Sequence, residues 1–280
     1  MVKKLLITGA NGYMGRHVVQ YACDAGYQVV ANDLVTDGID PRADISDVSI
    51  LSGDKGLFER LGRPDVCIHL AWRNGFVHNS PTHMMDLSSH IAFFYNMADA
   101  GLASFSAMGT MHEVGYWEGA IDENTPCNPL SQYGIAKNAM RQSVLLYAKD
   151  KPCQVKWLRA YYITGDDGRG SSIFAKITKA AAAGQTTFPF NSGKNLYDFI
   201  DVKDLARLIV LSSVQDEVHG VINVCTGKPI TLAERVEKFI QEHGYDIRLQ
   251  YGAFPDRPYD SPGIWGDTKK LDHVLRLIGK

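Results

Sequence analysis

Residues 4–15 read Lys-Leu-Leu-Ile-Thr-Gly-Ala-Asn-Gly-Tyr-Met-Gly, an apolar run that ends in glycines at positions 9, 12 and 15. An apolar run of this length before glycines is typical of a buried parallel strand followed by a tight turn. After the turn, Val18, Ala22 and Ala25 recur at helical spacing, and Gly26 supplies a stop signal. The sequence therefore opens with a predicted strand, turn and helix.

The same alternation continues along the chain. Further strands are predicted at 27–31, 66–71, 103–108, 155–160 and 221–224, and helices at 82–100 and 130–149. Strands that alternate with helices predict an α/β fold with a doubly wound parallel sheet, because right-handed crossovers place helices on both faces.

The glycine turn has the spacing GxxGxxG, which suits close approach of the backbone to a pyrophosphate beside a helix N-terminus. Asp33 ends the second predicted strand, where a carboxylate accepts hydrogen bonds from ribose hydroxyls and repels a 2′-phosphate. The pattern predicts a dinucleotide site that favours NAD, with NADP as the alternative. Its expected residues are Gly9, Asn11, Gly12, Tyr13, Met14, Gly15 and Asp33, with Asp44 and Ile45 beside the adenine ring.

Beyond residue 164 the chain becomes polar and glycine-rich over 165–172. The second half has too few predicted strands for an independent sheet domain. We therefore expect a Rossmann-like, NAD(P)-binding domain over 1–165 with parts of 196–225. A smaller substrate-binding cap is expected over 166–195 and 226–280, with the ligand in the crevice at the carboxyl ends of the strands.

Tyr133 and Lys137 lie four residues apart on a predicted helix and so share one face. A nearby ammonium favours the phenolate, which makes a tyrosine usable as an acid or base near neutrality. The same lysine can hold the nicotinamide ribose. The pair predicts a catalytic site for proton transfer.

Several further stretches belong to the same pattern. They are His69-Leu70-Ala71, Leu158-Arg159-Ala160-Tyr161-Tyr162-Ile163-Thr164-Gly165, Tyr197-Asp198-Phe199-Ile200-Asp201-Val202-Lys203-Asp204-Leu205-Ala206, and Ile222-Asn223-Val224-Cys225-Thr226-Gly227. With the glycines, Asp33, Asp44-Ile45 and the Tyr133–Lys137 pair, the chain resembles an extended short-chain dehydrogenase/reductase. This is the NAD-dependent epimerase/dehydratase family that acts on nucleotide sugars.

The resemblance implies oxidation or reduction of a hexose attached to a nucleoside diphosphate, with Tyr133 passing a proton to or from a sugar oxygen. It implies a partner hydroxyl, for which Ser106 and Thr110 are the candidates and Thr110 is preferred. It adds Leu70, Ala71 and Tyr161 to the cofactor site. It also implies a homodimer built from the helices near 82–100 and 130–150.

Departures from the family pattern narrow the reaction. Met111 and His112 follow Thr110, where dehydratases carry an Asp-Glu pair, so dehydration is disfavoured because methionine transfers no proton. Reduction of a 4-keto-(6-deoxy)hexose is favoured, with a 4-epimerase that retains its NAD as the alternative. The expected substrate contacts are Trp72, Arg73, Thr110, Tyr162, Tyr197 and Arg257, the last as the diphosphate clamp.

Composition excludes other classes of protein. Lysine and arginine number 29 against 31 acidic residues, so bulk charge predicts no nucleic-acid partner and no anionic membrane partner. No apolar run reaches the roughly 18–20 residues that span a bilayer. The five cysteines form no CxxC, and Tyr116 breaks an HExxH pattern that begins at His112, so neither a metal site nor a disulfide framework is expected. We expect a cytoplasmic enzyme; a non-catalytic NAD(H) sensor is disfavoured because Tyr133 and Lys137 are both present.

Overall fold

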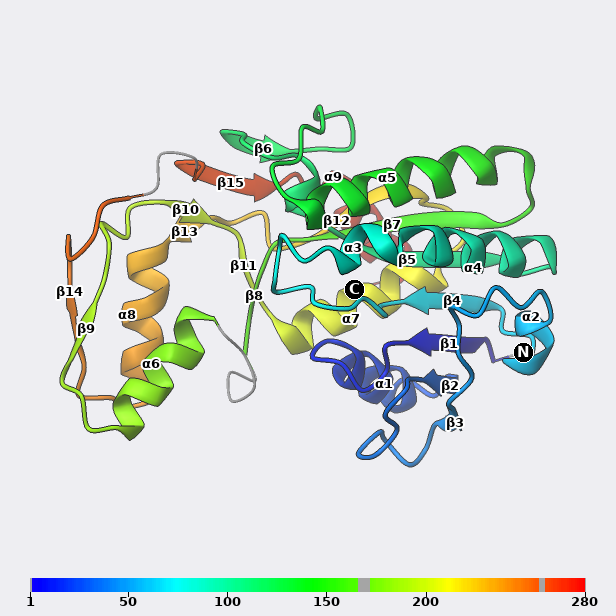
Figure 1. Cartoon of the computed structure of the whole chain (residues 1–280), viewed down its shortest axis with the longest axis horizontal. Helices are drawn as coiled ribbons and strands as arrows, with labels where there is room; N and C mark the ends of the chain where they lie inside the picture. Colours follow the sequence, from blue (N-terminus) through cyan, green and yellow to red (C-terminus); the bar gives the residue numbers. More distant parts are fainter. Residues whose placement is uncertain (1, 166–171, 257–259, 280) are drawn as a thin grey trace.

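The central sheet of the protein is parallel throughout (Figure 1). The computed structural model describes residues 2–165, 172–256 and 260–279, and within them seven strands form this sheet in the order β12-β7-β5-β4-β1-β2-β3. The strands are β1 (Lys4–Thr8), β2 (Gln28–Asn32), β3 (Asp44–Ser46), β4 (Val66–His69), β5 (Ser104–Thr110), β7 (Gln154–Ala160) and β12 (Gly220–Val224). The chain winds outward from β1 in one direction to β3 and in the other to β12. The reversal between β1 and β4 places a ligand crevice at their carboxyl ends.

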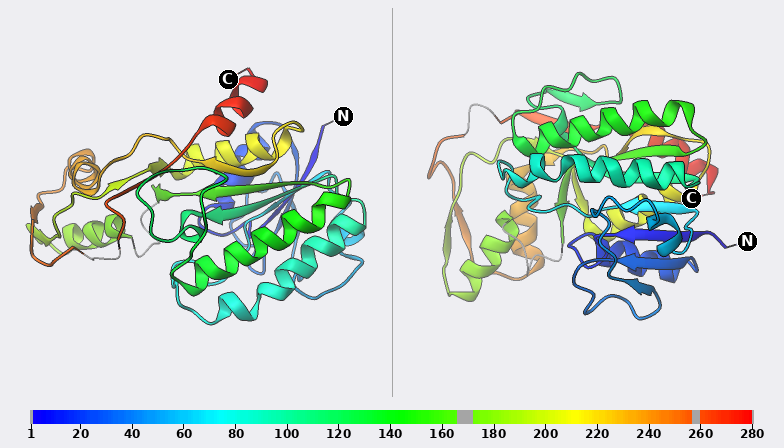
Figure 2. Two further views of the ribbon diagram at one scale, coloured as in Figure 1. Left: turned by 90° about the horizontal axis from the view of Figure 1, so that it is seen from above. Right: turned by 45° about the vertical axis from the view of Figure 1, so that its right-hand side comes forward.

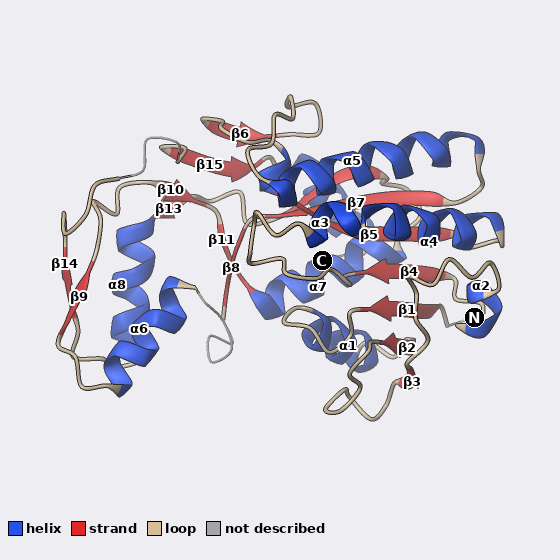
Figure 3. Ribbon diagram, in the orientation of Figure 1, coloured by secondary structure: helices blue, strands red, loops and turns tan. Residues whose placement is uncertain are grey.

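Helices cover both faces of the sheet, as the predicted doubly wound fold requires (Figures 2 and 3). One face packs under α1 (Gly15–Asp24), α7 (Val202–Val214) and α9 (Lys269–Leu277). The other packs under α2 (Leu57–Arg60), α4 (Leu87–Asp99) and α5 (Gln132–Tyr147). Consecutive residues of β1 divide between the two cores, with Leu5 and Ile7 in the first and Leu6 in the second. This double burial explains why the strands read as unbroken apolar runs.

A smaller layer projects from the carboxyl end of the sheet, at the left of Figure 1. Its own apolar core joins α6 (Ile173–Ala182) to α8 (Leu232–Glu242), beside the paired strands β9 (Thr187–Pro189) and β14 (Arg248–Gln250). Short strands connect this layer to the main sheet. They are β6 (Gly119–Ile121), β8 (Tyr162–Thr164), β10 (Leu196–Tyr197), β11 (Phe199–Asp201), β13 (Ile230–Thr231) and β15 (Gly263–Gly266).

The structure differs from the sequence expectations in three places. The helix expected at 82–100 is divided at Asp86 into α3 (Thr82–Met85) and α4. Residues 44–46, for which no strand was predicted, form the edge strand β3. Helix α9, which was expected in the cap, packs through Leu271 and Val274 into the core shared with α1 and α7, because its apolar face matches that side of the sheet.

Membrane-spanning segments were not expected. Among the helices that the structure describes, none combines the length and the apolar character needed to cross a lipid bilayer.

Candidate active site

The glycine turn lies between β1 and α1, at the reversal point of the sheet. Gly9 has a φ of +70°, and a Cβ there would come within 2.6 Å of the backbone nitrogen of Ala71, just beyond β4. A Cβ at Gly15 would overlap the carbonyl oxygen of Gly9, and Gly12 donates its N–H to that oxygen at 3.0 Å. The turn therefore has to be glycine to fold this tightly. Backbone N–H groups at the start of α1 make it suited to a pyrophosphate.

Asp33 faces this turn from the end of β2. Its carboxylate accepts the backbone N–H of Asn11 at 2.9 Å and that of Leu34 at 2.7 Å. The Asn11 side chain donates to the carbonyls of Val35 and Asp37, which ties the turn to the loop after β2. A carboxylate has about four acceptor positions, so the half-buried Asp33 retains capacity for ribose hydroxyls. These residues fit the adenosine half of NAD.

Other residues expected around the cofactor are placed as follows. Leu70 and Ala71 follow β4 and lie against Gly9 and Thr8; the N–H of Leu70 donates to the Thr8 carbonyl. Asp44 and Ile45 are exposed on β3, which pairs with β2.

Tyr161, which lies between β7 and β8, makes contacts that hold parts of the fold together. The Tyr161 hydroxyl donates to Asn223 at 3.1 Å, and the ring would lie 3.0 Å from a Cβ on Gly266. Burial, followed by the charge at Cys225, raises the pKa of Tyr161 far above its usual range. This side chain joins the sheet to the smaller layer.

Tyr133 and Lys137 lie in the first two turns of α5, beside the end of β5. Ser131 caps the helix by accepting the N–H of Gly134. The buried Lys137 donates from Nζ to the carbonyl of Met108 at 2.8 Å, and Nζ lies 5.9 Å from the centre of the Tyr133 ring. The geometry brings the predicted pair together at the carboxyl edge of the sheet.

Burial moves both pKa values of this pair. Burial, reinforced by the charge of Glu113, raises the pKa of Tyr133 well above 10, and a hydrogen bond with Thr110 opposes the rise. Burial lowers the pKa of Lys137 to about 7, which Glu113 partly offsets. Near neutrality the phenol is therefore protonated, and the lysine gains or loses its proton easily.

Aromatic and histidine rings surround the tyrosine, a feature that the sequence did not predict. The rings of His78 and His83 lie with their centres 5.6 and 5.2 Å from that of Tyr133. Trp72 and His112 meet it edge-on at 6.3 and 6.2 Å. These rings come from three segments, the loop after β4, α3 and the turn after β5, so sequence spacing carries no signal of their meeting.

Thr110 ends β5 and caps the 3-10 turn η1 (Met111–Glu113). Its hydroxyl accepts the N–H of His112 at 3.3 Å, while its own N–H donates to the Glu113 carboxylate at 2.7 Å. Ser106, the other candidate hydroxyl, is buried in the middle of β5. Thr110 is therefore the candidate at the strand end, next to Tyr133.

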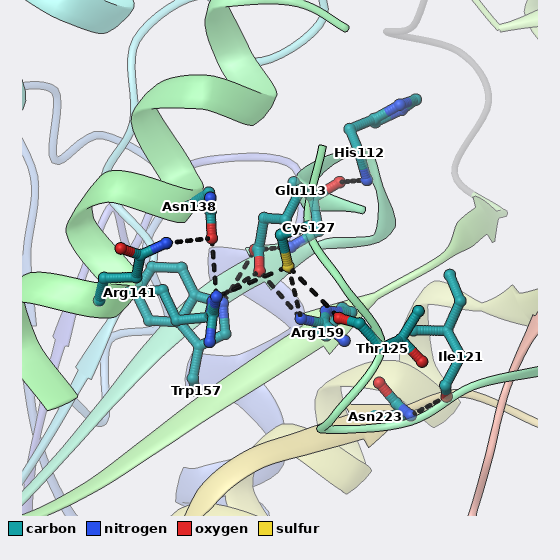
Figure 4. Close-up of polar contacts among 12 residues, drawn as sticks. His112, Glu113, Ile121, Thr125, Cys127, Asn138, Arg141, Trp157, Arg159 and Asn223 are labelled. Atoms are coloured by element: carbon teal, nitrogen blue, oxygen red, sulfur yellow. Dashed lines mark hydrogen bonds and ion pairs between the residues drawn. The ribbon is translucent and has the colours of Figure 1, made fainter. Parts of the chain in front are cut away.

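Glu113 lies in a buried charge cluster (Figure 4). Its oxygens accept the Trp157 indole N–H at 2.8 Å and meet the Arg159 guanidinium at 3.3 Å, with Arg141 at 3.6 Å. Both the Glu113 and Arg159 side chains are 0% exposed. The acid that survives from the dehydratase pattern is thus part of the scaffold under Thr110.

The expected substrate residues fall into separate places. The rings of Tyr162 and Tyr197 lie with their centres 4.1 Å apart and their planes tilted by 34°, where the sheet meets the smaller layer. Arg73 makes two hydrogen bonds of 2.7 Å to Asp86 and remains largely exposed. Trp72 is half-buried against Lys137. Arg257 lies outside the described residues.

Asp198 anchors the junction beside this tyrosine pair. The fully buried carboxylate accepts the backbone N–H groups of Thr226, Gly227 and Gly266, together with the Thr226 hydroxyl. In the sequence, the position of Asp198 between the aromatic residues Tyr197 and Phe199 was the feature that could have indicated its burial. Four donors on one buried carboxylate fix the loop after β12 against β15.

Known proteins resemble this chain along most of its length. The model of the NAD dependent epimerase/dehydratase family matches residues 5–225. A dTDP-6-deoxy-L-talose 4-dehydrogenase (NAD+) from Aggregatibacter actinomycetemcomitans is 44% identical over 269 residues, 94% of this chain and 98% of the relative. A putative UDP-glucose 4-epimerase from Methanocaldococcus jannaschii is 27% identical over 290 residues, 96% of this chain and 92% of the relative.

Solved structures share the fold. A UDP-N-acetylglucosamine 4-epimerase from Methanobrevibacter ruminantium in complex with UDP-N-acetylmuramic acid superposes with a TM-score of 0.84 at 20% identity, covering 98% of this chain and 92% of that one. A Thermus thermophilus UDP-glucose 4-epimerase in complex with NAD gives 0.79 at 20% identity, covering 96% and 92%. The family match spans the glycine turn, Asp33 and the Tyr133–Lys137 pair. The chain therefore belongs to the NAD-dependent epimerase/dehydratase family of extended short-chain dehydrogenases/reductases.

Proposed function

We propose that this protein is an NAD-dependent oxidoreductase that interconverts the 4-hydroxyl and 4-keto forms of a 6-deoxyhexose linked to dTDP. The observation that carries the proposal is the placement of Tyr133, Lys137 and Thr110 together at the carboxyl end of β5, on the same edge of the parallel sheet as the glycine turn. The choice of sugar and nucleotide follows the 44% identical relative, whose name specifies dTDP-6-deoxy-L-talose.

The chemistry assigns one proton to the protein. In the oxidation, the sugar loses a hydride from C4 and a proton from its 4-hydroxyl, and the products are the 4-keto sugar, NADH and a proton. NAD, when bound, supplies the acceptor for the hydride in this direction and the donor in the reverse one. Tyr133 takes the hydroxyl proton or returns it, and Thr110 hydrogen-bonds the same oxygen.

Lys137 tunes this proton transfer. A phenol in a buried site resists ionisation. The phenol therefore stays protonated, and the protonated form is the one that can donate a proton to the developing alkoxide during reduction. For the oxidation, Lys137 in its charged form favours the phenolate. Residues of the glycine turn, with Asp33, would hold the adenosine and pyrophosphate, and Lys137 would hold the nicotinamide ribose.

The buried position of Glu113 supports a reaction without dehydration. A 4,6-dehydration needs an acid and a base at C5 and C6 of the sugar. Trp157 and Arg159 hold the buried Glu113 carboxylate, and the Met111 side chain has no proton that it can transfer. Oxidation and reduction at C4 need neither group.

The remaining parts of the proposal concern the substrate and the assembly. Trp72, Arg73, Tyr162, Tyr197 and Arg257 would contact the nucleotide sugar, which lies between the sheet domain and the cap. We propose a homodimer through α4 and α5. A cytoplasmic location fits the five free cysteines.

A 4-epimerase is the second candidate, because the relative from Methanocaldococcus jannaschii carries that name. Mass analysis of the freshly purified and dialysed protein, followed by titration with NAD+ and NADP+, separates the two. An oxidoreductase releases its cofactor and binds NAD+ reversibly and more tightly than NADP+. NAD that survives dialysis supports the epimerase, and binding of neither dinucleotide contradicts both functions.

A further inference from the structure

Trp72 contacts the catalytic lysine directly. Nζ of Lys137 lies 3.8 Å from the centre of the indole ring, closer than its 5.9 Å to the Tyr133 ring. An ammonium has three N–H donors, and the Met108 carbonyl accepts one of them at 2.8 Å. The π face of an indole attracts a cation more strongly than any other aromatic side chain does. The ring is therefore a partner for the remaining positive charge of Lys137.

The indole itself is fixed from two sides. Its N–H donates to Nδ1 of His83 at 3.0 Å, and Nε2 of His83 in turn meets the Val77 carbonyl at 3.0 Å. The ring of His90 stacks on the indole with centres 4.6 Å apart and planes 17° apart. These contacts come from α3 and α4, so two helices hold the ring that faces α5.

A buried hydrogen-bonded chain in turn holds His90. Its Nδ1 lies 2.9 Å from Nε2 of His69, whose Nδ1 lies 2.8 Å from the Thr8 hydroxyl. Burial lowers the pKa of His90 to about 4 and keeps the pKa of His69 well below its usual range. Both imidazoles are neutral at neutral pH, so they do not compete with Lys137 for the indole.

Carboxylate charge near Lys137 is already engaged. Glu113 is the acid that acts on the lysine, but it is paired with Arg159. The titratable and charged groups around Lys137 and its indole are Tyr133 on α5, Glu113 on η1, His69 on β4, His83 on α3 and His90 on α4. Two further charges, Arg73 and Asp86, act on His90 and are paired with each other. In this environment the Trp72 indole face is the group that stabilises the buried ammonium form of Lys137.

We propose that Trp72 is a positioning residue, which holds the protonated Lys137 side chain beside Tyr133 through the π face of an indole fixed by His83 and His90. This rests on the proposed function insofar as Lys137 tunes Tyr133. It assigns to Trp72 a role in the protonation of the lysine, in addition to any contact with the sugar.

The direct test is the titration of Lys137 by NMR. Protein labelled with ¹³C at the lysine Cε carbons is titrated with pH, and Lys137→Met identifies the signal of Lys137. Trp72→Leu should lower the midpoint by about one pH unit, because the charged form loses its aromatic partner. Trp72→Phe keeps a weaker π face and should lower it by less than half of that. Trp117→Leu, on a tryptophan whose indole donates to Ala120, is the matched control and should leave the midpoint unchanged.

The outcomes separate this proposal from the function. An unchanged or raised midpoint in Trp72→Leu contradicts the positioning role. If that variant does not fold, Trp72→Phe and His83→Leu carry the test: each should lower the midpoint by several tenths of a unit, and an unchanged midpoint in both contradicts the proposal. The titration needs neither cofactor nor sugar, so absence of turnover with dTDP-sugars would overturn the function and leave this result standing. With turnover, Trp72→Leu should reduce kcat about 10-fold, while any contact of the indole with the sugar should appear in KM.

Discussion

Glu113 and Arg159 form an ion pair with no solvent exposure, and the same carboxylate accepts the backbone N–H of Thr110. The pair therefore connects Arg159 on β7 to the backbone of Thr110 at the end of β5. Removal of one partner of a buried pair leaves the other charge without compensation.

Glu113→Gln should lower the free energy of unfolding by about 3 kcal/mol, because Arg159 is left buried without its counter-ion. Urea denaturation of the two proteins measures this. Glu59→Gln removes the acid of an exposed pair with Arg63 and should leave the stability unchanged within error. Equal effects of the two substitutions would show that the Glu113 pair is not structural.

Tyr133→Phe should reduce kcat about 10³-fold, because it removes the hydroxyl that carries the proton while the ring still packs against His78. Steady-state kinetics and the Kd for NAD+ are the measurements. The Kd should change less than 3-fold. Retention of more than a tenth of the wild-type kcat would exclude Tyr133 as the proton carrier.

Gly9→Ala should abolish measurable NAD+ binding. The new Cβ would meet the backbone after β4, and the alanine would have to adopt a φ of +70°. Isothermal titration calorimetry checks the binding. Gly75→Ala is the matched control, because a Cβ there meets nothing within 4 Å and its φ is not positive. Full NAD+ affinity in Gly9→Ala would contradict the assignment of the turn to the pyrophosphate.

Asp33→Ala should weaken NAD+ binding by about 10-fold and reduce the discrimination against NADP+, because the carboxylate no longer accepts from the ribose or repels a 2′-phosphate. Titration of both dinucleotides gives the ratio of the two Kd values. A ratio equal to that of the wild type would place the adenosine ribose elsewhere.

Lys137 should make stability depend on pH. Its pKa is lowered to about 7 in the folded protein, against 10.5 as the reference value, so the unfolded chain binds more protons between these limits. Stability should therefore rise with pH between about 7 and 10.5, with a slope that approaches about 1.4 kcal/mol per pH unit. The difference in unfolding free energy between the wild type and Lys137→Met isolates this slope. A difference that is flat or falls over this range contradicts a buried, easily deprotonated amine.

The sequence predicted most of the sheet because double burial makes each central strand an apolar run, and glycines stop it at the ligand end. It predicted the pairing of Tyr133 with Lys137 because helical spacing alone brings them to one face. Local pattern could not predict the inward direction of Glu113, whose partners Trp157 and Arg159 are 44 and 46 residues away.

The ring cluster around Tyr133 depends on the same kind of distant contact. His83 is buried although the apolar residues that follow it, Met84 and Met85, are exposed, because the Trp72 indole reaches the histidine from the loop after β4. Helix α9 packs against the main sheet rather than in the cap. Its apolar stripe predicts that one face is buried, but only the tertiary packing decides in which core.

The most direct test of the central claim is incubation of the purified protein with NAD+ and dTDP-6-deoxy-L-talose. NADH is followed by absorbance and the sugar product by NMR. The proposed oxidoreductase should form NADH and a 4-keto sugar in equal amounts, and Tyr133→Phe should abolish the reaction. Conversion to a 4-epimer without net NADH, or failure to oxidise this sugar while a UDP-hexose is turned over, would contradict it.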